Sequence, residues 1–334
     1  MVDIDGSFGE GGGQILRTAV ALSAMTREPV RITNIRAGRE NPGLRPQHLK
    51  AVEAVGLLCG AEVEGLTAGS AEVSFAPGKI KAGSIRVDIG TAGSVTLLLQ
   101  AMLPVALKAP GEVVIEVFGG TDVSHSPTIG YFEHVFLPVI RSIGCEVELE
   151  VQKRGFYPKG CGQVRLRTKP WNHPRRIELI GREPYESIDV YSTATEHLMK
   201  QEVAERQVKG FLMKISPMHE VERVMRQYVP SSSIGSSFLA VAKYGNTRLG
   251  ACVLGERGLK AEDVGKMAAD ALLKEMSYEA PLDQHMADQI IPYLAMACGE
   301  VRVSKVTEHT RTNACVVNLF GQGIEIDGNR IIKR

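Results

Sequence analysis

Hydrophobic positions near the N-terminus alternate between helical and strand spacing. Residues 11–24 follow a loop of small residues and place apolar side chains three and four positions apart, which predicts a buried helix. Residues 29–35 are rich in β-branched side chains and predict a strand. Pro42 precedes a second helical pattern that ends near Gly60, as expected for proline close to helix starts and glycine just past helix ends.

The same order of elements recurs further along the chain, which indicates an internal repeat. Residues 93–106 predict a helix after a Gly/Ser loop, residues 112–117 predict a strand, and Pro127 leads into a helix that ends near Gly144. The two helix ends also match, because Cys-Gly-Ala-Glu-Val-Glu around Gly60 corresponds to Ile-Gly-Cys-Glu-Val-Glu around Gly144. The chain therefore contains at least two copies of one unit of helices and strands.

A third and weaker copy is predicted at the C-terminus. Residues 288–297 are helical in pattern, residues 300–306 predict a strand, residues 311–319 fit a helix or a strand, and residues 324–327 end the unit. Extra hairpin strands are predicted in the first two copies, at residues 72–75 and 162–167. Units of this size cannot bury their apolar faces alone, so they should pack together. The expected fold class is α+β, with a large domain of three repeated α+β units.

One stretch between the second and third copies does not fit the repeat. Its pattern predicts, in order, a strand at 187–191, a helix at 195–207, a helical stretch near 220–227, strands at 236–243 and 249–254, and a helix at 261–275. We interpret residues 183–280 as a small α/β domain inserted between the second and third repeats, in preference to a fourth, diverged copy. The large domain would then comprise residues 1–182 and 281–334.

Composition and charge narrow the class of protein without naming its activity. The 334 residues are 44% hydrophobic and 23% charged, with a net charge of +1, so any nucleic-acid site must be a local basic patch. The six cysteines form no Cys-x-x-Cys pair, which predicts reduced thiols in a cytoplasmic protein and no structural zinc site. The longest apolar run, residues 95–107, is too short to span a bilayer, so no membrane partner is expected.

A glycine-rich loop at residues 5–14 is the first candidate site. Its glycines expose backbone N–H groups directly before a predicted helix, which favours anion binding. Glu10 lies within the loop and suits a metal ion better than a bare phosphate. The loop lacks the Gly-Lys-Ser/Thr of a Walker A motif, and Gln14 replaces the third glycine of a dinucleotide motif. A tight turn that needs positive φ explains the glycines equally well.

Three arginines, Arg36, Arg39 and Arg45, occur around Pro-Gly turns and are balanced by few acids. Guanidinium groups match phosphate geometry, so this segment is a second candidate, although charged turns are often merely solvated.

Four further segments carry isolated polar groups. They are a Gly/Ser-rich helix start leading to Gln100, a strand-to-helix loop ending at Pro127, a segment with His285, Asp288 and Gln289, and a segment with His309, Thr312 and Asn313. On composition alone each has a structural explanation: a satisfied core glutamine, a required turn, a helix start and a structural histidine.

Taken together, these segments resemble the RNA 3′-terminal phosphate cyclase family in order and over nearly the whole chain. The resemblance rests on Gly-Glu-Gly-Gly-Gly-Gln-Ile-Leu-Arg at 9–17, on the motifs at 35–39, 42–44, 47–49, 92–94, 99–100, 119–122, 155–158 and 287–289, and on His309 with Thr312 and Asn313. It implies the domain arrangement described above, and a related packing of such units occurs in enolpyruvyl transferases.

The resemblance also implies a reaction in three steps. His309 attacks the α-phosphorus of ATP and forms a covalent histidine–AMP; AMP then passes to the 3′-phosphate of RNA; and the vicinal 2′-hydroxyl closes a 2′,3′-cyclic phosphate and releases AMP. A neutral imidazole is a competent nucleophile near pH 7, and α-phosphoryl transfer mainly needs positioning and charge neutralisation. RNA 3′-phosphate ends are the implied partners, and a homodimer is left open.

The roles of individual residues follow from the same resemblance. Glu10 would hold Mg²⁺ or Mn²⁺, which prefer oxygen ligands. Phosphates of ATP or of the RNA end would be bound by Arg17, Arg36, Arg39 and Gln47. The nucleotide pocket would be lined by Gln100, Pro127, His285, Asp288 and Gln289. His285 stands where relatives carry an aromatic residue, so its stacking on adenine should be weaker, and Cys161 replaces a usual glycine.

Two other functions compete with this reading. A cyclase-like branch of the superfamily acts as an RNA-binding ribosome-assembly factor without nucleotidyl transfer, but it lacks the nucleophilic histidine that this chain keeps at His309. An enolpyruvyl transferase would share only the repeat architecture, because its substrate-binding pattern is absent from this sequence.

Overall fold

The structure is a computed structural model that describes residues 1–216 and 218–334, and its described residues form four sheets of four strands each. The first unit is built from β1 (Val2–Asp5), α1 (Gly13–Thr26), β2 (Val30–Thr33), α2 (Pro46–Cys59), β3 (Glu62–Glu64) and β4 (Val73–Ala76). Its sheet has the order β1-β2-β4-β3, with β1 parallel to β2 and the other neighbours antiparallel. Proline begins α2, and Gly60 ends it at φ 61°, a conformation that glycine adopts without strain.

The second unit repeats this plan. It comprises β5 (Gly83–Asp88), α3 (Val95–Ala106), β6 (Val113–Gly119), the helical turns α4 (Ile129–Tyr131), η1 (Phe132–Phe136) and α5 (Leu137–Ser142), and the hairpin of β7 (Val147–Lys153) and β8 (Gly162–Thr168). The order β5-β6-β8-β7 matches the first sheet strand for strand. A π-helical turn, η1, interrupts the second helix of this unit.

The third unit has the same topology but is not continuous in sequence. Its sheet has the order β15-β16-β14-β9, formed by β9 (Ile177–Leu179), β14 (Gly299–Arg302), β15 (Ile324–Asp327) and β16 (Arg330–Lys333). The helices α8 (Met286–Gln289) and α9 (Ile291–Ala297) precede β14, and α10 (Glu308–Leu319) follows it. Because β9 pairs in parallel with β14, the fourth sheet interrupts the third unit after its first strand instead of preceding the whole unit.

The fourth sheet, β11-β10-β12-β13, consists of β10 (Ser187–Thr195), β11 (Val221–Val229), β12 (Ser236–Tyr244) and β13 (Thr247–Leu254). One face is covered by α6 (Val203–Ile215) and α7 (Ala261–Ser277), and a short turn, η2 (Glu196–Gln201), precedes α6. The predicted helical stretch near residues 220–227 is wrong, because these residues form β11 parallel to β10. The helix predicted from residue 195 begins only at Val203.

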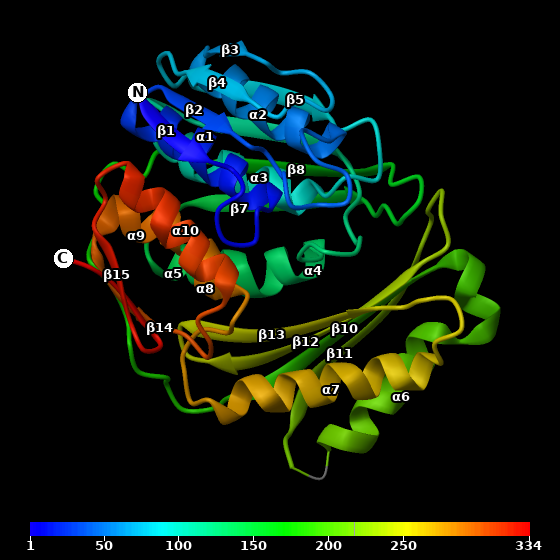
Figure 1. The fold of residues 1–334 in the computed structure, drawn as a ribbon. Coiled ribbons are helices and arrows are strands. Elements are labelled where there is room, and N and C mark those ends of the chain that lie inside the picture. Colours follow the sequence, from blue (N-terminus) through cyan, green and yellow to red (C-terminus); the bar gives the residue numbers. More distant parts are fainter. Residues whose placement is uncertain (217) are drawn as a thin grey trace.

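Two hydrophobic cores hold the molecule together. The larger is shared by the three units, whose helices pack on one another: α1 contacts α2, α3 and α10. The smaller lies between the fourth sheet and its two helices. Figure 1 shows α6 and α7 on the outer face of the fourth sheet, while its inner face is turned toward α4 and α8. The α+β class predicted from the sequence is confirmed. No helix among the described residues is long and apolar enough to cross a membrane.

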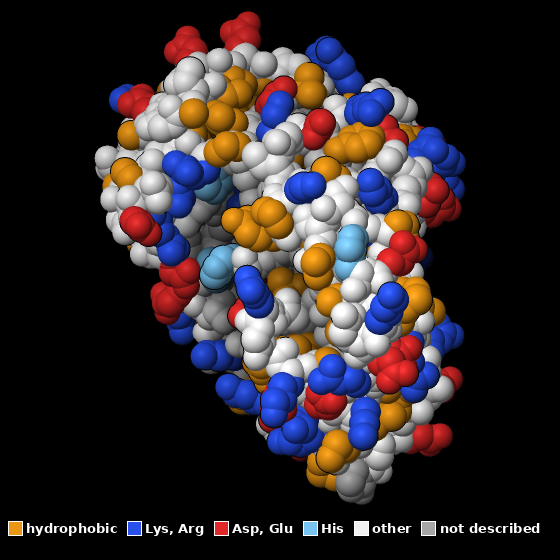
Figure 2. Space-filling model, turned by 90° about the vertical axis from the view of Figure 1, so that its right-hand side faces the viewer, with side chains coloured by type: hydrophobic (Ala, Val, Ile, Leu, Met, Phe, Trp, Pro, Cys, Tyr) orange, Lys and Arg blue, Asp and Glu red, His pale blue; other side chains and the backbone are white. Residues whose placement is uncertain are grey.

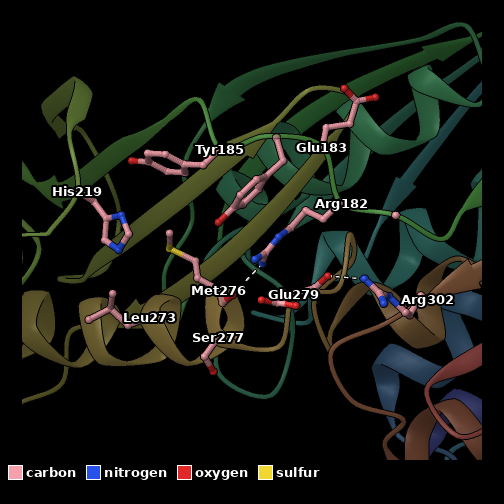
Figure 3. A pocket seen from close by; sticks show the side chains of 11 residues that line it. Arg182, Glu183, Tyr185, His219, Leu273, Met276, Ser277, Glu279 and Arg302 are labelled. Atoms are coloured by element: carbon pink, nitrogen blue, oxygen red, sulfur yellow. Dashed lines mark hydrogen bonds between the residues drawn. The ribbon is translucent and has the colours of Figure 1, made fainter.

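The two chain segments that connect the fourth sheet to the third unit lie against each other. Arg182, on the outgoing segment, donates a hydrogen bond to the Met276 carbonyl at 2.8 Å and stacks on the Tyr244 ring at 4.5 Å. On the returning segment, the Glu279 carbonyl accepts a hydrogen bond from Arg302 of β14 at 2.6 Å. Figure 3 shows Arg182, Glu279 and Arg302 around a hollow at the junction.

Candidate active site

A cavity of about 720 Å³ lies between the repeated units and the fourth sheet. Its lining comes from α1, α3, the 123–128 loop, β13, the start of α7, α8 and α10. Figure 2 shows a hollow between the upper and lower parts of the molecule, with Lys, Arg and His side chains near its rim. The predicted site residues that line the cavity are Arg17, Gln100, Pro127, His285, Asp288, Gln289 and His309.

His309 is the second residue of α10 and is half exposed. The helix start is fixed by Thr307, whose hydroxyl accepts a hydrogen bond from the Thr310 N–H at 3.2 Å. The Nε2 atom of His309 lies 3.1 Å from Oε2 of Glu10. Since the N-terminal end of a helix attracts anions, the imidazole stands where a phosphate would be stabilised.

The glycine-rich loop brings Glu10 to this position. Gly9 adopts φ 58°, and a Cβ on it would collide with the hydroxyl of Thr312, so the loop lies directly on α10. Oε2 of Glu10 is also 3.9 Å from Nη2 of Arg39. Glu10 is therefore placed between the imidazole and a guanidinium that the sequence predicts to bind phosphate.

Amide side chains connect α1, α8 and α10 behind His309. Nε2 of Gln14 donates to the His309 carbonyl at 2.6 Å and to Oδ1 of Asn313 at 3.2 Å. Thr18 donates to the same oxygen at 2.8 Å, and Nδ2 of Asn313 donates to the Asp288 carbonyl at 3.2 Å. This network fixes the first turn of α10 and explains why Asn313 accompanies His309 in the motif.

A second set of amide hydrogen bonds connects residues of α3 and α8 that line the cavity. Nε2 of Gln100 donates to Oε1 of Gln289 at 2.6 Å, and Nε2 of Gln289 donates to the His285 carbonyl at 2.6 Å. The Pro127 carbonyl accepts from Thr96 at 2.7 Å. Three of the predicted nucleotide-pocket residues are thus joined directly, and their ordered amides present a polar edge to the cavity.

Arg17 and Asp288, two groups of opposite charge, both line the cavity. Burial lowers the pKa of Arg17 to about 10, against the opposing effect of the Asp288 carboxylate, so the guanidinium keeps its charge at neutral pH. Burial raises the pKa of Asp288 to about 6, although His309, His285 and Arg17 oppose the shift.

The raised pKa of Asp288 predicts a pH dependence of stability. Its folded-state pKa of about 6 lies above the ordinary value of 3.8, so the stabilising effect of the proton is complete below about pH 4 and is lost as pH rises through about 6. We expect Asp288→Asn to lessen the loss of stability between these pH values, as measured by thermal unfolding across that range. Asp270→Asn, at an exposed aspartate, is the control and should follow the parent curve. Parallel curves for Asp288→Asn and the parent would contradict the assigned pKa.

The arginine loop is structured by its own side chains. Arg36 adopts φ 56°, and its guanidinium donates to the carbonyls of Asn41 at 2.6 Å and Gly43 at 3.2 Å. Burial, reinforced by Arg45 and Arg39, lowers the pKa of Arg36. Arg36 therefore uses part of its hydrogen-bonding capacity within the loop. Its positive charge is close to those of Arg45 and Arg39, and a bound anion would reduce the repulsion among them.

His48 joins this arginine cluster to the start of α1. Its Nδ1 accepts a hydrogen bond from the Arg45 N–H at 3.2 Å, so Nε2 carries the proton. Burial, followed by the charges of Arg17, Arg36 and Arg45, lowers the pKa of His48 to about 3, which keeps the ring neutral. A Cβ on Gly13 would collide with Nε2, which explains the glycine at this position.

Three of the predicted phosphate-binding residues, Arg36, Arg39 and Gln47, do not line the cavity itself. Arg39 is near the cavity because it lies beside Glu10, which contacts His309. Oε1 of Gln47 accepts a hydrogen bond from the Ser94 N–H at the start of α3, at 3.3 Å. Their phosphate-binding role stays a prediction, as do the roles of the cavity-lining residues.

Sequence reasoning missed the importance of Asp283, which lies just before the segment with His285, Asp288 and Gln289. Its fully buried carboxylate accepts hydrogen bonds from the Tyr131 hydroxyl at 2.7 Å, the Gly250 N–H at 2.9 Å, and the N–H groups of His285 and Met286, each at 2.9 Å. It thereby connects the second unit, β13 and α8 at the edge of the cavity. The Tyr131 and His285 rings then meet edge to face at 6.1 Å.

The apolar part of the lining was also missed, because it comes from the segment that does not belong to the repeat. Leu254 and Leu259 from the end of β13 and the following turn, with Met267 of α7, form this wall. This apolar wall becomes apparent only in the structure, where the fourth sheet packs beside the repeated units.

The side chains around His309 suit a metal ion that is held mainly by the phosphate groups of a bound substrate. Among the described residues, no group of three or more His, Cys, Asp or Glu side chains could hold a metal ion. Glu10 is the carboxylate nearest His309. Mg²⁺ commonly uses one or two carboxylates together with substrate phosphates, and a single carboxylate beside an anion-attracting helix start suits that mode.

A repeated α+β scaffold in which helix starts, the Arg17 guanidinium and an exposed imidazole meet at one cavity is typical of an enzyme that acts on phosphate groups. The comparisons narrow this class. The family model described as RNA 3′-terminal phosphate cyclase matches residues 8–326. The chain belongs to the RNA 3′-terminal phosphate cyclase family, as the sequence motifs predicted.

Similarity to individual relatives extends over essentially the full length. The chain is 46% identical to the RNA 3′-terminal phosphate cyclase of Pyrococcus furiosus, over 98% of this chain and 96% of the relative. Identity to the protein of the same name from Archaeoglobus fulgidus is 46%, over 99% of each chain. For that of Methanopyrus kandleri it is 47%, over 96% of this chain and 93% of the relative.

Proposed function

We propose that the protein converts the 3′-terminal phosphate of RNA to a 2′,3′-cyclic phosphate at the expense of ATP, through a histidine–AMP and an RNA–adenylate. The observation that carries the proposal is the position of His309. Its imidazole is half exposed at the start of α10, in a cavity that it shares with Arg17 and the Gln100–Gln289 pair. Relatives of the same family carry the corresponding name, which supports the reaction class.

In the first step, Nε2 of His309 attacks the α-phosphorus of ATP. The N–P bond forms as the bond to the bridging oxygen breaks, and pyrophosphate leaves. Attack requires the lone pair of Nε2, so its contact with Glu10 must be released when ATP binds. Arg17 and the N-terminal ends of α1 and α10 supply positive potential for the charge that develops on the phosphate oxygens.

In the second step, an oxygen of the RNA 3′-phosphate attacks the phosphorus of histidine–AMP, and the imidazole leaves. In the third, the 2′-hydroxyl oxygen attacks the 3′-phosphorus, AMP leaves, and the hydroxyl proton is lost to solvent or base. Arg39, Arg36 and Gln47 are proposed to hold the RNA phosphate, since Arg39 adjoins Glu10 beside the imidazole.

Base recognition is assigned to the other end of the cavity. Pro127 and the His285 ring offer flat surfaces to adenine, and Gln289, Gln100 and Asp288 provide polar contacts. Glu10 would hold Mg²⁺ or Mn²⁺ against the ATP phosphates, where the ion neutralises charge. We further propose that residues 1–182 and 281–334 form the catalytic part and that residues 183–280 are an inserted part that closes one wall.

The proposal is tested by following both substrates. The protein is incubated with a divalent metal ion, ATP labelled at the α-phosphate and RNA that ends in a 3′-phosphate. We expect acid-labile, alkali-stable label on the protein, and one AMP released for each 2′,3′-cyclic end. RNA with a 3′-hydroxyl is the control and should yield no cyclic end. A folded protein that binds RNA but takes up no label would favour an assembly factor of the cyclase-like type instead.

A further inference from the structure

The loop between β7 and β8 carries an exposed tyrosine although its backbone is tightly packed. A Cβ on Gly160 would come within 2.8 Å of the Ala92 Cα, and one on Gly155 would collide with the Gly162 backbone. The Gly155 carbonyl accepts the N–H groups of Thr121 at 2.8 Å and Asp122 at 3.2 Å. Despite this packing, the side chain of Tyr157 is 72% exposed. The loop is therefore a rigid support that presents an aromatic ring to solvent.

The same loop is anchored to the fourth sheet. Phe156 is buried, and a Cβ on Gly235 would collide with its ring. The Lys159 N–H donates to the hydroxyl of Ser233 at 3.0 Å. Ile234, between these two contacts, is 62% exposed. Tyr157 and Ile234 thus stand on adjoining loops from the two parts of the molecule.

A buried ion pair of the second unit also binds the fourth sheet. Nη1 of Arg154 lies 3.1 Å from Oδ2 of Asp122, and Ser237 of β12 donates to Oδ1 of the same carboxylate at 2.9 Å. Asp122 directly precedes the 123–128 loop that lines the cavity. Val123, the next residue along the chain, lines the cavity. The Asp122–Arg154 pair that supports the loop of Tyr157 therefore lies beside the active-site cavity.

Two exposed lysines lie close to the tyrosine along the chain. Lys153 and Lys159 are exposed, and neither forms an ion pair with any residue that the structure describes. Further down the hairpin the acidic and basic positions alternate across the strands, since Glu148 is opposite Arg167 and Glu150 is opposite Arg165. We call the group of Tyr157, Ile234, Lys153 and Lys159 the junction patch. Figure 2 looks onto this side of the molecule and shows Lys and Arg side chains interspersed with hydrophobic ones.

We propose that the junction patch binds single-stranded RNA upstream of the reacting 3′ end, with a base stacked on Tyr157 and phosphates held by Lys153 and Lys159. The inference rests on the proposed function for its choice of strand. A cavity of about 720 Å³ has the size of a site for one small ligand, so the rest of an RNA chain must lie outside it. Aromatic rings with nearby cations form the usual platform for unpaired bases. A stable contact with a second copy of the chain would need roughly 1,000 Å² or more, which two exposed apolar side chains do not supply.

The test compares RNA of two lengths, each ending in a 3′-phosphate, by fluorescence anisotropy at fixed salt in the full-length protein. We expect Tyr157→Ala to weaken binding of a 12-mer by about tenfold, the loss of one base–aromatic stack, and to leave a dinucleotide unaffected. Tyr157→Trp should restore binding. Tyr278→Ala, at an exposed tyrosine elsewhere, is the matched control. Lys153→Ala and Lys159→Ala should each reduce the slope of log affinity against log salt by about 0.7.

Three outcomes would overturn the proposal: unchanged affinity of Tyr157→Ala for the 12-mer, an equal loss for both lengths, or a changed oligomeric state in light scattering with RNA binding intact. The last would identify the patch as a contact between copies of the chain. Labelling by α-labelled ATP needs no RNA, so it should be equal in Tyr157→Ala and the parent. RNA affinity in turn is measured without ATP, so failure of the proposed reaction and failure of the patch are read separately.

Discussion

His309→Ala is expected to abolish transfer of AMP from ATP to the protein. The substitution removes the nitrogen that we propose as nucleophile, and removal of a covalent nucleophile lowers turnover by about 10⁴-fold or more. The fold should be unaffected, because the side chain is half exposed and contacts the partly exposed carboxylate of Glu10. We expect a change of no more than about 0.5 kcal/mol in the free energy of unfolding. Gel detection of label from α-labelled ATP measures the first effect and thermal unfolding the second.

Two further variants make this result specific. His197→Ala, at an exposed histidine of η2, should take up label as the parent does. Asn313→Ala removes a support of His309 without removing the imidazole, so label should still appear, but more slowly. Persistent labelling of a folded His309→Ala protein at the parent rate would move the nucleophile to another residue.

Asp283→Ala should produce the largest loss of stability of any single substitution considered. The carboxylate is fully buried and accepts four hydrogen bonds, two of which, from Tyr131 and Gly250, come from distant segments. Its removal leaves buried donors without acceptors, which costs about 3–5 kcal/mol. The thermal midpoint should fall by roughly 5–15 °C. Because Asp283 also holds the N–H of His285, we expect the KM for ATP to rise more than kcat falls.

The controls separate burial from charge. Asp270→Ala removes an exposed aspartate that is paired with Lys214 and should change stability by at most about 0.5 kcal/mol. Tyr131→Phe removes only one of the four donors and should cost about 1 kcal/mol. A thermal midpoint of Asp283→Ala within 2 °C of the parent would show that these hydrogen bonds contribute little.

The repeat was predictable from the sequence because the glycines that end its helices act through the local backbone conformation. Gly60 ends α2 in the left-handed conformation, and Gly144 ends the corresponding helix of the second unit at φ 99°. The first strands of the three units, β1, β5 and β9, were missed. β1 and β9 are only four and three residues long, too short for alternation to stand out, and β5 has six residues but buries only one of their side chains. The position of β9 could not be predicted, because its pairing with β14 joins residues more than a hundred positions apart.

The error at residues 220–227 has a different physical cause. Val221, Val224 and Tyr228 occur at spacings of three and four, as on a helix, yet the segment pairs with β10 along its whole length. β11 is an edge strand with several exposed side chains, so the alternation expected of a half-buried strand is weak. Tertiary pairing overrides the local pattern there.

For the candidate site, motifs identified the polar residues that converge on His309 but not their connections. Glu10, Gln14 and Asn313 could be named from the sequence, whereas their contacts cross nearly three hundred positions of chain. Asp283 and the apolar wall at Leu254 and Met267 lay outside any motif strong enough to assign them. Their importance depends on burial and on how the two parts of the molecule pack together. Neither can be read from the spacing of residues along the chain.

The split third unit places both ends of the fourth sheet's segment at a single point on the scaffold. Arg182 bonds to the Met276 carbonyl across the two connections, and β9 and β14 are neighbours in one sheet. The scaffold is therefore interrupted at one surface junction rather than threaded through its centre. We therefore expect that lengthening, shortening or exchanging the inserted piece would alter one wall of the cavity and leave the three repeated units and the position of His309 unchanged.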